Sequence, residues 1–180
     1  MYSRILVPID GSETSAHALD AALELAHEHD AELKPVYVVD VPQLMYSGPA
    51  CDPSLVREAF VKEGALVLAD AAAKMLRAGV RGSTLVVEVD PLGDDIAQRI
   101  TAAAKDFSAD LVVMGTHGRR GWRRLVLGSV AERFLRISTR PVLLVPLHCA
   151  EKKEPRKVNT VRAASTVSTV STLDVAGASI

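Results

Sequence analysis

The sequence predicts a doubly wound α/β domain, in which a mostly parallel five-stranded sheet carries helices on both faces. Five short apolar runs rich in β-branched residues are typical of buried strands: residues 5–9, 33–39, 84–89, 111–114 and 142–145. Segments with helical periodicity separate them, and this alternation indicates parallel strands joined by right-handed crossovers. Aromatic residues make up only 4% of the 180 residues, so Val, Leu, Ile and Ala must build the core.

The helices between these runs are predicted from their periodicity and their end signals. The first two cover residues 12–29 and 54–77, and each gathers apolar side chains on one face: Ala18, Ala22, Leu25 and Ala26, then Leu55, Ala59, Leu66, Ala69 and Ala73. End signals are Asp52 with Pro53 before the second helix, Gly79 after it, and Pro91, Asp94 and Asp95 before the third. A fourth helix is expected to begin at Ser129.

The domain is expected to be complete at about residue 147, where the fifth strand ends. Residues 148–180 contain no aromatic side chain and combine a charged patch, 151–157, with a Ser/Thr/Val-rich stretch, 165–172. This low-complexity composition favours a linker or a disordered tail. The alternative is that the Val/Thr-rich part pairs with the edge of a sheet.

The net charge of -1 conceals an uneven distribution of charge. Near-neutrality excludes a polyanion-binding surface spread over the whole molecule. Residues 115–140, however, contain seven arginines and one acid, Glu132. Guanidinium groups in a glycine-rich loop suit an anionic ligand such as a phosphate, because they present donors in a fixed geometry. Nucleic-acid binding and ordinary solvated arginines are the alternatives at this point.

The segment after the fourth strand carries the strongest chemical signal. It places Gly115, Gly118 and Gly128 in a loop that leads into a helix at Ser129. Glycine lets backbone N–H groups approach and surround phosphate oxygens, and a helix N-terminus favours an anion. Ser129 to Glu132 also fits a capping box, so the serine has a purely structural alternative. The P-loop and dinucleotide-binding patterns are both missing, which excludes those two classes.

This glycine spacing, G-2x-G-9x-G(S/T), resembles that of nucleotide-binding members of the universal stress protein family. The opening residues 5–12, the segment 36–40 and the ending 140–146 are similar to the same family. The resemblance spans residues 1–147 and implies a single Rossmann-like domain with the strand order 3-2-1-4-5. In that order the first and fourth strands are neighbours whose connections diverge, and ligands of open α/β sheets bind at such a switch point.

The resemblance implies ATP as the ligand, with AMP or ADP as alternatives, and Mg²⁺ bridging the phosphates. The implied base and ribose contacts are Pro8, Asp10, Val38 and Met114, with Val38 acting through its backbone. The implied phosphate contacts are Gly115, Gly118, Gly128, Ser129 and Val130, with Arg119 as a further charge partner. Asp10 has a structural alternative as the cap of the helix near Ser12. His117 has no matching carboxylate or nucleophile nearby, which favours a loop-stabilising or solvated histidine over a catalytic one.

These observations predict a regulatory ATP-binding protein with slow hydrolysis at most. An Mg²⁺-dependent ATPase or nucleotidyl-transfer enzyme that uses Asp10 is the first alternative, and a nucleic-acid-binding module that uses the arginine-rich loop is the second. The resemblance also implies a homodimer through the fifth strands, residues 142–145, which would otherwise leave a sheet edge open. Met1 leads directly into the first strand and no apolar run is long enough to span a membrane, so a cytoplasmic protein is expected.

Overall fold

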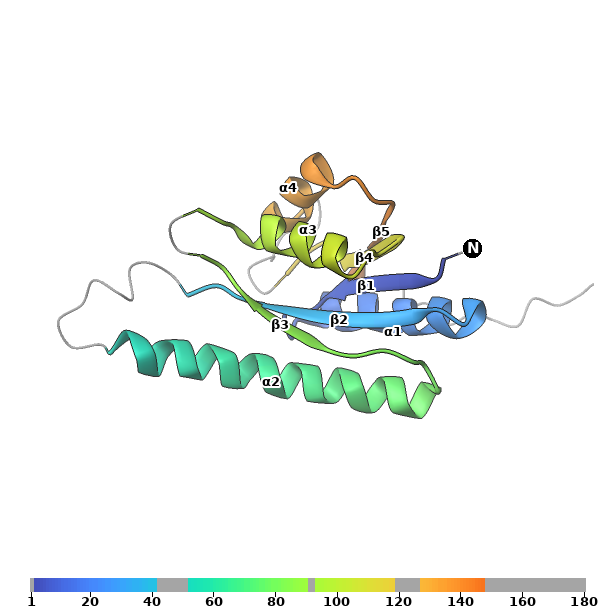
Figure 1. Ribbon diagram of the computed structural model, residues 1–180, viewed down its shortest axis with the longest axis horizontal. Helices are drawn as coiled ribbons and strands as arrows, with labels where there is room; N and C mark the ends of the chain where they lie inside the picture. Colours follow the sequence, from blue (N-terminus) through green and yellow to red (C-terminus); the bar gives the residue numbers. More distant parts are fainter. Residues whose placement is uncertain (1, 42–51, 91–92, 119–126, 148–180) are drawn as a thin grey trace, which may run out of the picture.

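The computed structural model describes residues 2–41, 52–90, 93–118 and 127–147 (Figure 1). Strands and helices alternate through them: β1 (Arg4–Pro8), α1 (Glu13–His29), β2 (Glu32–Val39), α2 (Pro53–Ala78), β3 (Leu85–Glu88), α3 (Ile96–Asp106), β4 (Leu111–Gly115), α4 (Ser129–Ile137) and β5 (Val142–Val145). Three sequence-based predictions lie outside the described residues: the start signal at Pro91, the charge partner Arg119 and the tail 148–180.

The strands form one sheet in the order β3-β2-β1-β4-β5, with every described neighbouring pair parallel. The central strand β1 pairs with β2 from Arg4↔Glu32 onward and with β4 at Ile5↔Leu111. This order confirms the predicted five-stranded parallel sheet, and each strand lies within one residue of its predicted run. β4 extends to Gly115, so the first glycine of the loop is the last residue of a strand.

Helices cover both faces of the sheet and enclose two hydrophobic cores. α1 and α2 pack on one face, and α3 and α4 pack on the other (Figure 1). Alternation along β1 divides its side chains between the cores, because Ile5 and Val7 enter the first and Leu6 enters the second. Phe134 anchors α4 in the second core with only 1% of its surface exposed. The two cores explain why apolar residues occupy successive positions in the middle of these strands.

The predicted end signals of α2 and α3 are present in the structure. Asp52 caps α2 by accepting a hydrogen bond from the Ser54 amide, and Gly79 ends the same helix in the left-handed conformation at φ 65°. Asp95 caps α3 in a full capping box with Gln98. These observations confirm the predicted signals at Asp52, Gly79 and Asp95.

The apolar repeat that predicts α2 lies on the exposed side of this helix. Leu55 and Leu66 are 63% and 67% exposed, and Ala59, Ala69 and Ala73 are exposed as well. A different set of residues faces the sheet: Gly64, Leu68, Ala71 and Met75. The periodicity therefore identifies the helix correctly but marks a face that does not contribute to the core.

Gly64 allows α2 to approach β2 closely. A Cβ atom added at Gly64 would lie 2.5 Å from the Cδ1 atom of Tyr37, which is buried on β2. A larger residue would push the helix away from the sheet.

Within the described residues, no helix combines the length and the apolar character needed to cross a membrane.

Candidate ligand-binding site

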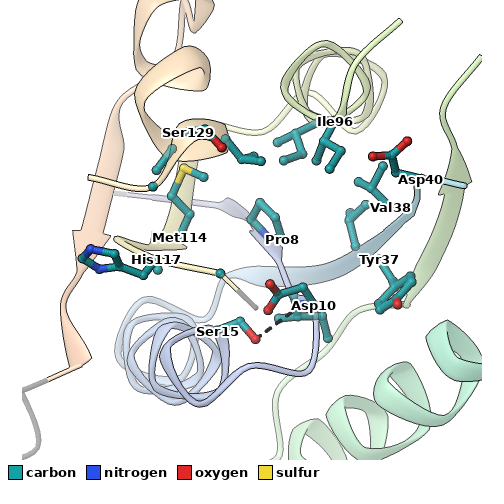
Figure 2. Close-up of a pocket in the computed structure, with 18 of the residues that line it drawn as sticks. Pro8, Asp10, Ser15, Tyr37, Val38, Asp40, Ile96, Met114, His117 and Ser129 are labelled. Atoms are coloured by element: carbon teal, nitrogen blue, oxygen red, sulfur yellow. Dashed lines mark hydrogen bonds between the residues drawn. The ribbon is translucent and has the colours of Figure 1, made fainter. Parts of the chain in front are cut away.

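A pocket of about 300 Å³ lies at the carboxyl ends of β1, β2 and β4. β1 and β4 are neighbours in the sheet, and the connections that follow them lead to α1 on one face and α4 on the other. The pocket therefore occupies the switch point of the sheet, the usual ligand position in open α/β folds. Figure 2 shows residues from both faces converging on it.

The glycine loop forms one end of this pocket. The Thr116 amide donates to the Val145 carbonyl at 3.1 Å, and the Gly128 amide donates to the Thr116 carbonyl at 2.8 Å. These two bonds fold the start and the end of the loop together, which brings Gly115, Gly118 and Gly128 to the same pocket wall. The structure thus brings together all three glycines that the sequence predicted.

Close approaches explain why these positions carry glycine. A Cβ atom would lie 2.8 Å from Thr14 Cγ2 at Gly115, 2.7 Å from Asp10 Oδ2 at Gly118 and 3.1 Å from the Thr116 carbonyl at Gly128. A side chain at Gly118 would displace the carboxylate of Asp10 in particular. The glycines consequently allow the segment that follows β4 to lie in close contact with the segment that follows β1.

The N-terminus of α4 points into the same end of the pocket. The predicted capping box at Ser129 is wrong: the cap position is Gly128, whose carbonyl accepts a hydrogen bond from the Glu132 amide at 2.8 Å. The helix thus begins one residue too early for Ser129 to cap it, and Glu132 pairs with Arg136 at 2.6 Å instead.

No side chain makes a capping hydrogen bond at this helix end in the described structure. Ser129, Val130 and Ala131 line the pocket here. Uncapped N–H groups together with the helix dipole favour an anion at this point.

Asp10 connects the first helix to the glycine loop. It follows β1, and its Oδ1 atom accepts hydrogen bonds from the amide and the hydroxyl of Ser12 at 3.0 and 2.6 Å. Its own amide donates to the Ser15 hydroxyl at 3.3 Å, as Figure 2 shows. The suggestion that Asp10 caps α1 is wrong, because Ser12 is the cap and Asp10 holds Ser12 in place. The other carboxylate oxygen, Oδ2, lies beside Gly118.

The opposite end of the pocket is mostly apolar. Pro8 and Val38 line it together with Ile96 and Ile100 from α3, whereas Met114 lies beside Ser129 at the other end of the pocket (Figure 2). The Val36 carbonyl accepts from the Ile9 amide on the β1 side of β2. Val38 lies two residues after Val36, so its amide and carbonyl point to the same side of β2 as those of Val36. At this position β1 has already ended, at Pro8. The backbone of Val38 therefore offers one donor and one acceptor to this end.

The pocket also contains residues that were not predicted from the sequence. Ser15, Tyr37, Asp40, Phe60, Ile96 and Ile100 line the pocket without having been predicted there. Asp40 follows β2 directly, so the rule that functional residues gather at carboxyl ends of strands would have found it. Its half-buried carboxylate makes no hydrogen bond or ion pair with a described residue. Ile96 and Ile100 share one face of α3, a spacing that sequence alone assigns to the core.

His117 stands between two of the glycines and stabilises the loop. Its Nδ1 atom lies 3.0 Å from the Thr116 hydroxyl, and within the described residues its buried Nε2 atom has no hydrogen-bond partner. The hydroxyl contact agrees with the interpretation of His117 as a loop residue. Arg119, the neighbouring charge partner that the sequence suggested, is outside the described residues.

The parallel sheet with helices on both faces defines a doubly wound α/β protein. Its switch-point pocket is edged by glycines and a helix N-terminus. Comparison with known proteins gives the family. A sequence model of the Universal stress protein family matches residues 1–146. The chain belongs to the universal stress protein family.

Individual relatives agree with this assignment. The chain is 36% identical to the universal stress protein MJ0531 of Methanocaldococcus jannaschii over 87% of its own length and 85% of that protein. A crystal structure of a universal stress protein family member from Burkholderia pseudomallei is 50% identical, with a TM-score of 0.68 over 81% of this chain and 96% of that one.

Two more distant structures share the fold and carry nucleotides. A universal stress protein in complex with cAMP is 24% identical, with a TM-score of 0.57 over 81% of this chain and 98% of its own. One from Archaeoglobus fulgidus in complex with dAMP is 23% identical, with a TM-score of 0.54 over 80% and 98%.

Proposed function

We propose that this protein binds an adenine nucleotide, ATP with AMP or ADP as alternatives, in the switch-point pocket and acts as a regulatory stress-response module with little or no turnover. The observation that carries the proposal is the uncapped N-terminus of α4, which faces the same pocket as Gly115, Gly118 and Gly128. A phosphate at this point would accept hydrogen bonds from N–H groups that no side chain caps in the described structure. The nucleotide complexes of two proteins with this fold agree with the proposal.

The phosphate end has suitable donors and one suitable carboxylate. The amides of Ser129 and Val130 would hold the outer phosphates, and Gly115 and Gly118 would approach the ribose and the inner phosphate. Asp10 would contact the ribose or a phosphate-bound Mg²⁺ through Oδ2, since Mg²⁺ in nucleotide sites is held by one or two carboxylates plus phosphate oxygens. No cluster of three metal-ligating side chains occurs among the described residues. The metal would therefore arrive with the nucleotide rather than occupy a site of its own.

The base end suits a flat ring with adjacent donor and acceptor groups. Pro8, Ile96 and Ile100 supply apolar walls, while the Val38 backbone offers an amide and a carbonyl. The edge of adenine carries an acceptor ring nitrogen beside an exocyclic amine, which matches that pair of backbone groups. Asp40 adds a further acceptor at this end. These contacts favour adenine over a base with a carbonyl at the same position.

Two candidate bases among the described residues of the pocket are partly engaged by the fold. Oδ1 of Asp10 is occupied by Ser12, and His117 is held by Thr116. An enzyme that activates water needs a base within hydrogen-bond reach of the nucleophile. We accordingly propose nucleotide retention in the cytoplasm as the function, with an Asp10-dependent ATPase as the alternative. Turnover well above a slow background that is lost in Asp10→Ala would favour the enzyme.

Calorimetry of ATP with Mg²⁺ tests the binding proposal directly. Wild type should bind, and Gly118→Val should not, because its side chain would collide with the Asp10 carboxylate. Gly93→Val is the matched control, since nothing lies within 4 Å of a Cβ atom at that glycine. Absence of binding by folded wild-type protein would reject the proposal. Mass spectrometry of freshly purified protein would identify a nucleotide that is retained from the cell.

We also propose a homodimer through β5. This strand is the last in the sheet, pairs on one side with β4, and presents Leu143 with 39% of its surface exposed. Unpaired edge strands are routinely covered by a second strand. Sedimentation velocity should show a dimer that is weakened in Leu143→Lys. A monomer at micromolar concentration would contradict a β5 dimer.

A further inference from the structure

The exposed side of α2 carries a line of six apolar residues and one lysine that neither core uses. We call these residues the α2 seam: Leu55, Ala59, Lys62, Leu66, Ala69, Ala73 and Leu76. All seven are exposed, and the three leucines have 63%, 67% and 83% of their surface in solvent. Leu76 is thus almost completely uncovered although it belongs to one of the most apolar residue types.

The spacing of the α2 seam is that of a helix–helix contact. Its members follow one another at intervals of four and three residues in strict alternation, which is the seven-residue repeat of coiled coils. The sheet-facing side of α2 is already complete, because Leu68, Ala71 and Met75 are buried there. A helix that is apolar on a second side, opposite its own core, presents that side to a partner.

The order of side chains along the α2 seam selects a second copy of the same helix as that partner. In a parallel pair, Lys62 would face Lys62 of the second copy, which places like charges in the contact. An antiparallel pair avoids this and matches long side chains with short ones in each layer. Ala59 then lies opposite Leu76, Lys62 opposite Ala73, and Leu66 opposite Ala69, and each layer occurs twice by symmetry.

Charge supports the same antiparallel register. Asp70 is exposed on α2 and precedes Ala73 by one helical turn. When Lys62 lies opposite Ala73 of the second copy, its ammonium group reaches the Asp70 carboxylate of that copy. The symmetry repeats this pair at the other end of the contact. Lys62, the one polar member of the α2 seam, thereby gains a partner of opposite charge.

We propose that the α2 seam is an interface between two copies of this protein, formed by antiparallel packing of their α2 helices. The inference does not depend on nucleotide binding, because none of the seven seam residues lines the pocket. It is also compatible with pairing through β5. α2 packs on β2 and β3, so the two surfaces lie toward opposite ends of the sheet (Figure 1).

Sedimentation velocity of the full chain over a dilution series is the decisive measurement. Wild type should self-associate through the α2 seam, and Leu66→Glu and Leu76→Glu should each weaken that step by about tenfold or more. Both residues are exposed, so thermal unfolding monitored by circular dichroism should stay unchanged. Wild type that is monomeric throughout, or self-association that is unchanged in both variants, would overturn the proposal.

A charge exchange tests the antiparallel register and guards against nonspecific effects of charge. Lys62→Glu alone should weaken the association, because it places a carboxylate against Asp70 of the second copy. Combining Lys62→Glu with Asp70→Lys should restore association to near the wild-type strength. Leu143→Lys on β5 serves as the matched control and should leave the α2 step intact. Failure of the double variant to recover would overturn the antiparallel register.

Discussion

Asp10 shows how one carboxylate can serve the fold and the site with different oxygens. Oδ1 accepts two hydrogen bonds from Ser12 and fixes the start of α1, whereas Oδ2 lies beside Gly118 at the pocket. Burial of the Ser15 side chain, whose hydroxyl accepts from the Asp10 amide, holds this turn from the other side. Asp10 thus supports the cap residue Ser12 with one oxygen, while its second oxygen leaves the proposed binding role open to test.

Two substitutions separate the roles of Asp10. Asp10→Ala should lower the free energy of unfolding by roughly 1–2 kcal/mol, because it removes the acceptor of two hydrogen bonds, and should abolish ATP binding with Mg²⁺. Asp10→Asn keeps an acceptor oxygen but no charge, so its stability should stay near wild type while its Mg²⁺-dependent affinity falls. Urea denaturation and calorimetry with and without Mg²⁺ measure the two effects. Equal ATP affinity in all three proteins would show that Asp10 has a structural role only.

Asp40 permits a test of base selectivity. Its half-buried carboxylate at the base end can accept from the exocyclic amine of adenine but repels the carbonyl that inosine carries in its place. Wild type should therefore prefer ATP to ITP, and Asp40→Ala should reduce that preference by about tenfold, the size of one hydrogen bond to a charged group. Competition titrations with both nucleotides give the ratio. A preference that is unchanged in the variant would assign selectivity to Val38 alone.

At the scale of elements, an ion pair joins α4 to the N-terminus of α3. Asp95 caps α3 through Oδ1, and its other carboxylate oxygen accepts a hydrogen bond from Arg133 on α4. Arg133 is one of the seven arginines that suggested an anionic ligand, yet it serves an ion pair between helices. The count of arginines thus overstated the charge available to a ligand.

Asp95→Ala should destabilise the protein by roughly 1–2 kcal/mol. Loss of an N-cap costs about 1 kcal/mol, and the exposed ion pair with Arg133 adds up to about 1 kcal/mol. Asp94→Ala is a close control, since Asp94 pairs with Arg99 at 3.5 Å but does not cap the helix. Chemical denaturation of the three proteins compares their midpoints. A smaller effect in Asp95→Ala than in Asp94→Ala would contradict this assignment.

The positions of strands and helices could be predicted from the sequence better than the contacts that these elements make. Strand and helix periods are local, so strands such as β5 and helix ends such as Gly79 could be placed from sequence alone. The direction that a helix face takes depends on the tertiary contact, and the apolar repeat of α2 led to the exposed side for that reason. The start of α4 at Ser129 was predicted correctly, but the capping box was wrong because the cap position falls on Gly128, one residue earlier.

The candidate site followed a similar division. The three loop glycines were predicted because their spacing is fixed along the chain, and the structure brings them to one pocket wall. Phe60 and Ile96 reach the same pocket from helices, and only the packing of those helices on the sheet places them there. Long-range neighbours of this kind carry no local signal.

At the scale of the whole molecule, the two proposed protein contacts determine what assembly can form. Each contact is self-complementary, and β5 and α2 lie at opposite ends of the sheet. Two symmetric contacts on one chain close into a tetramer when their two-fold axes intersect at right angles, whereas axes that do not intersect give open chains. The nucleotide pocket lies between the two ends, at β1 and β4, so ligand binding can act on either contact only through the sheet and its helices.

The domain boundary gives a last prediction at this scale. Both described cores consist of residues up to 145, and the family match ends at residue 146. A chain that ends after Leu147 should therefore unfold in one cooperative transition, with a melting temperature within about 2 °C of that of the full chain. In a domain of this size a shift of about 2–4 °C corresponds to about 1 kcal/mol, so we expect the loss of residues 148–180 to cost less than that. It should also bind ATP with unchanged affinity, since the lining of the pocket lies within residues 8–131. Calorimetric scans and ATP titrations of both chains make the comparison, and a marked loss of either property would show that residues 148–180 belong to the domain.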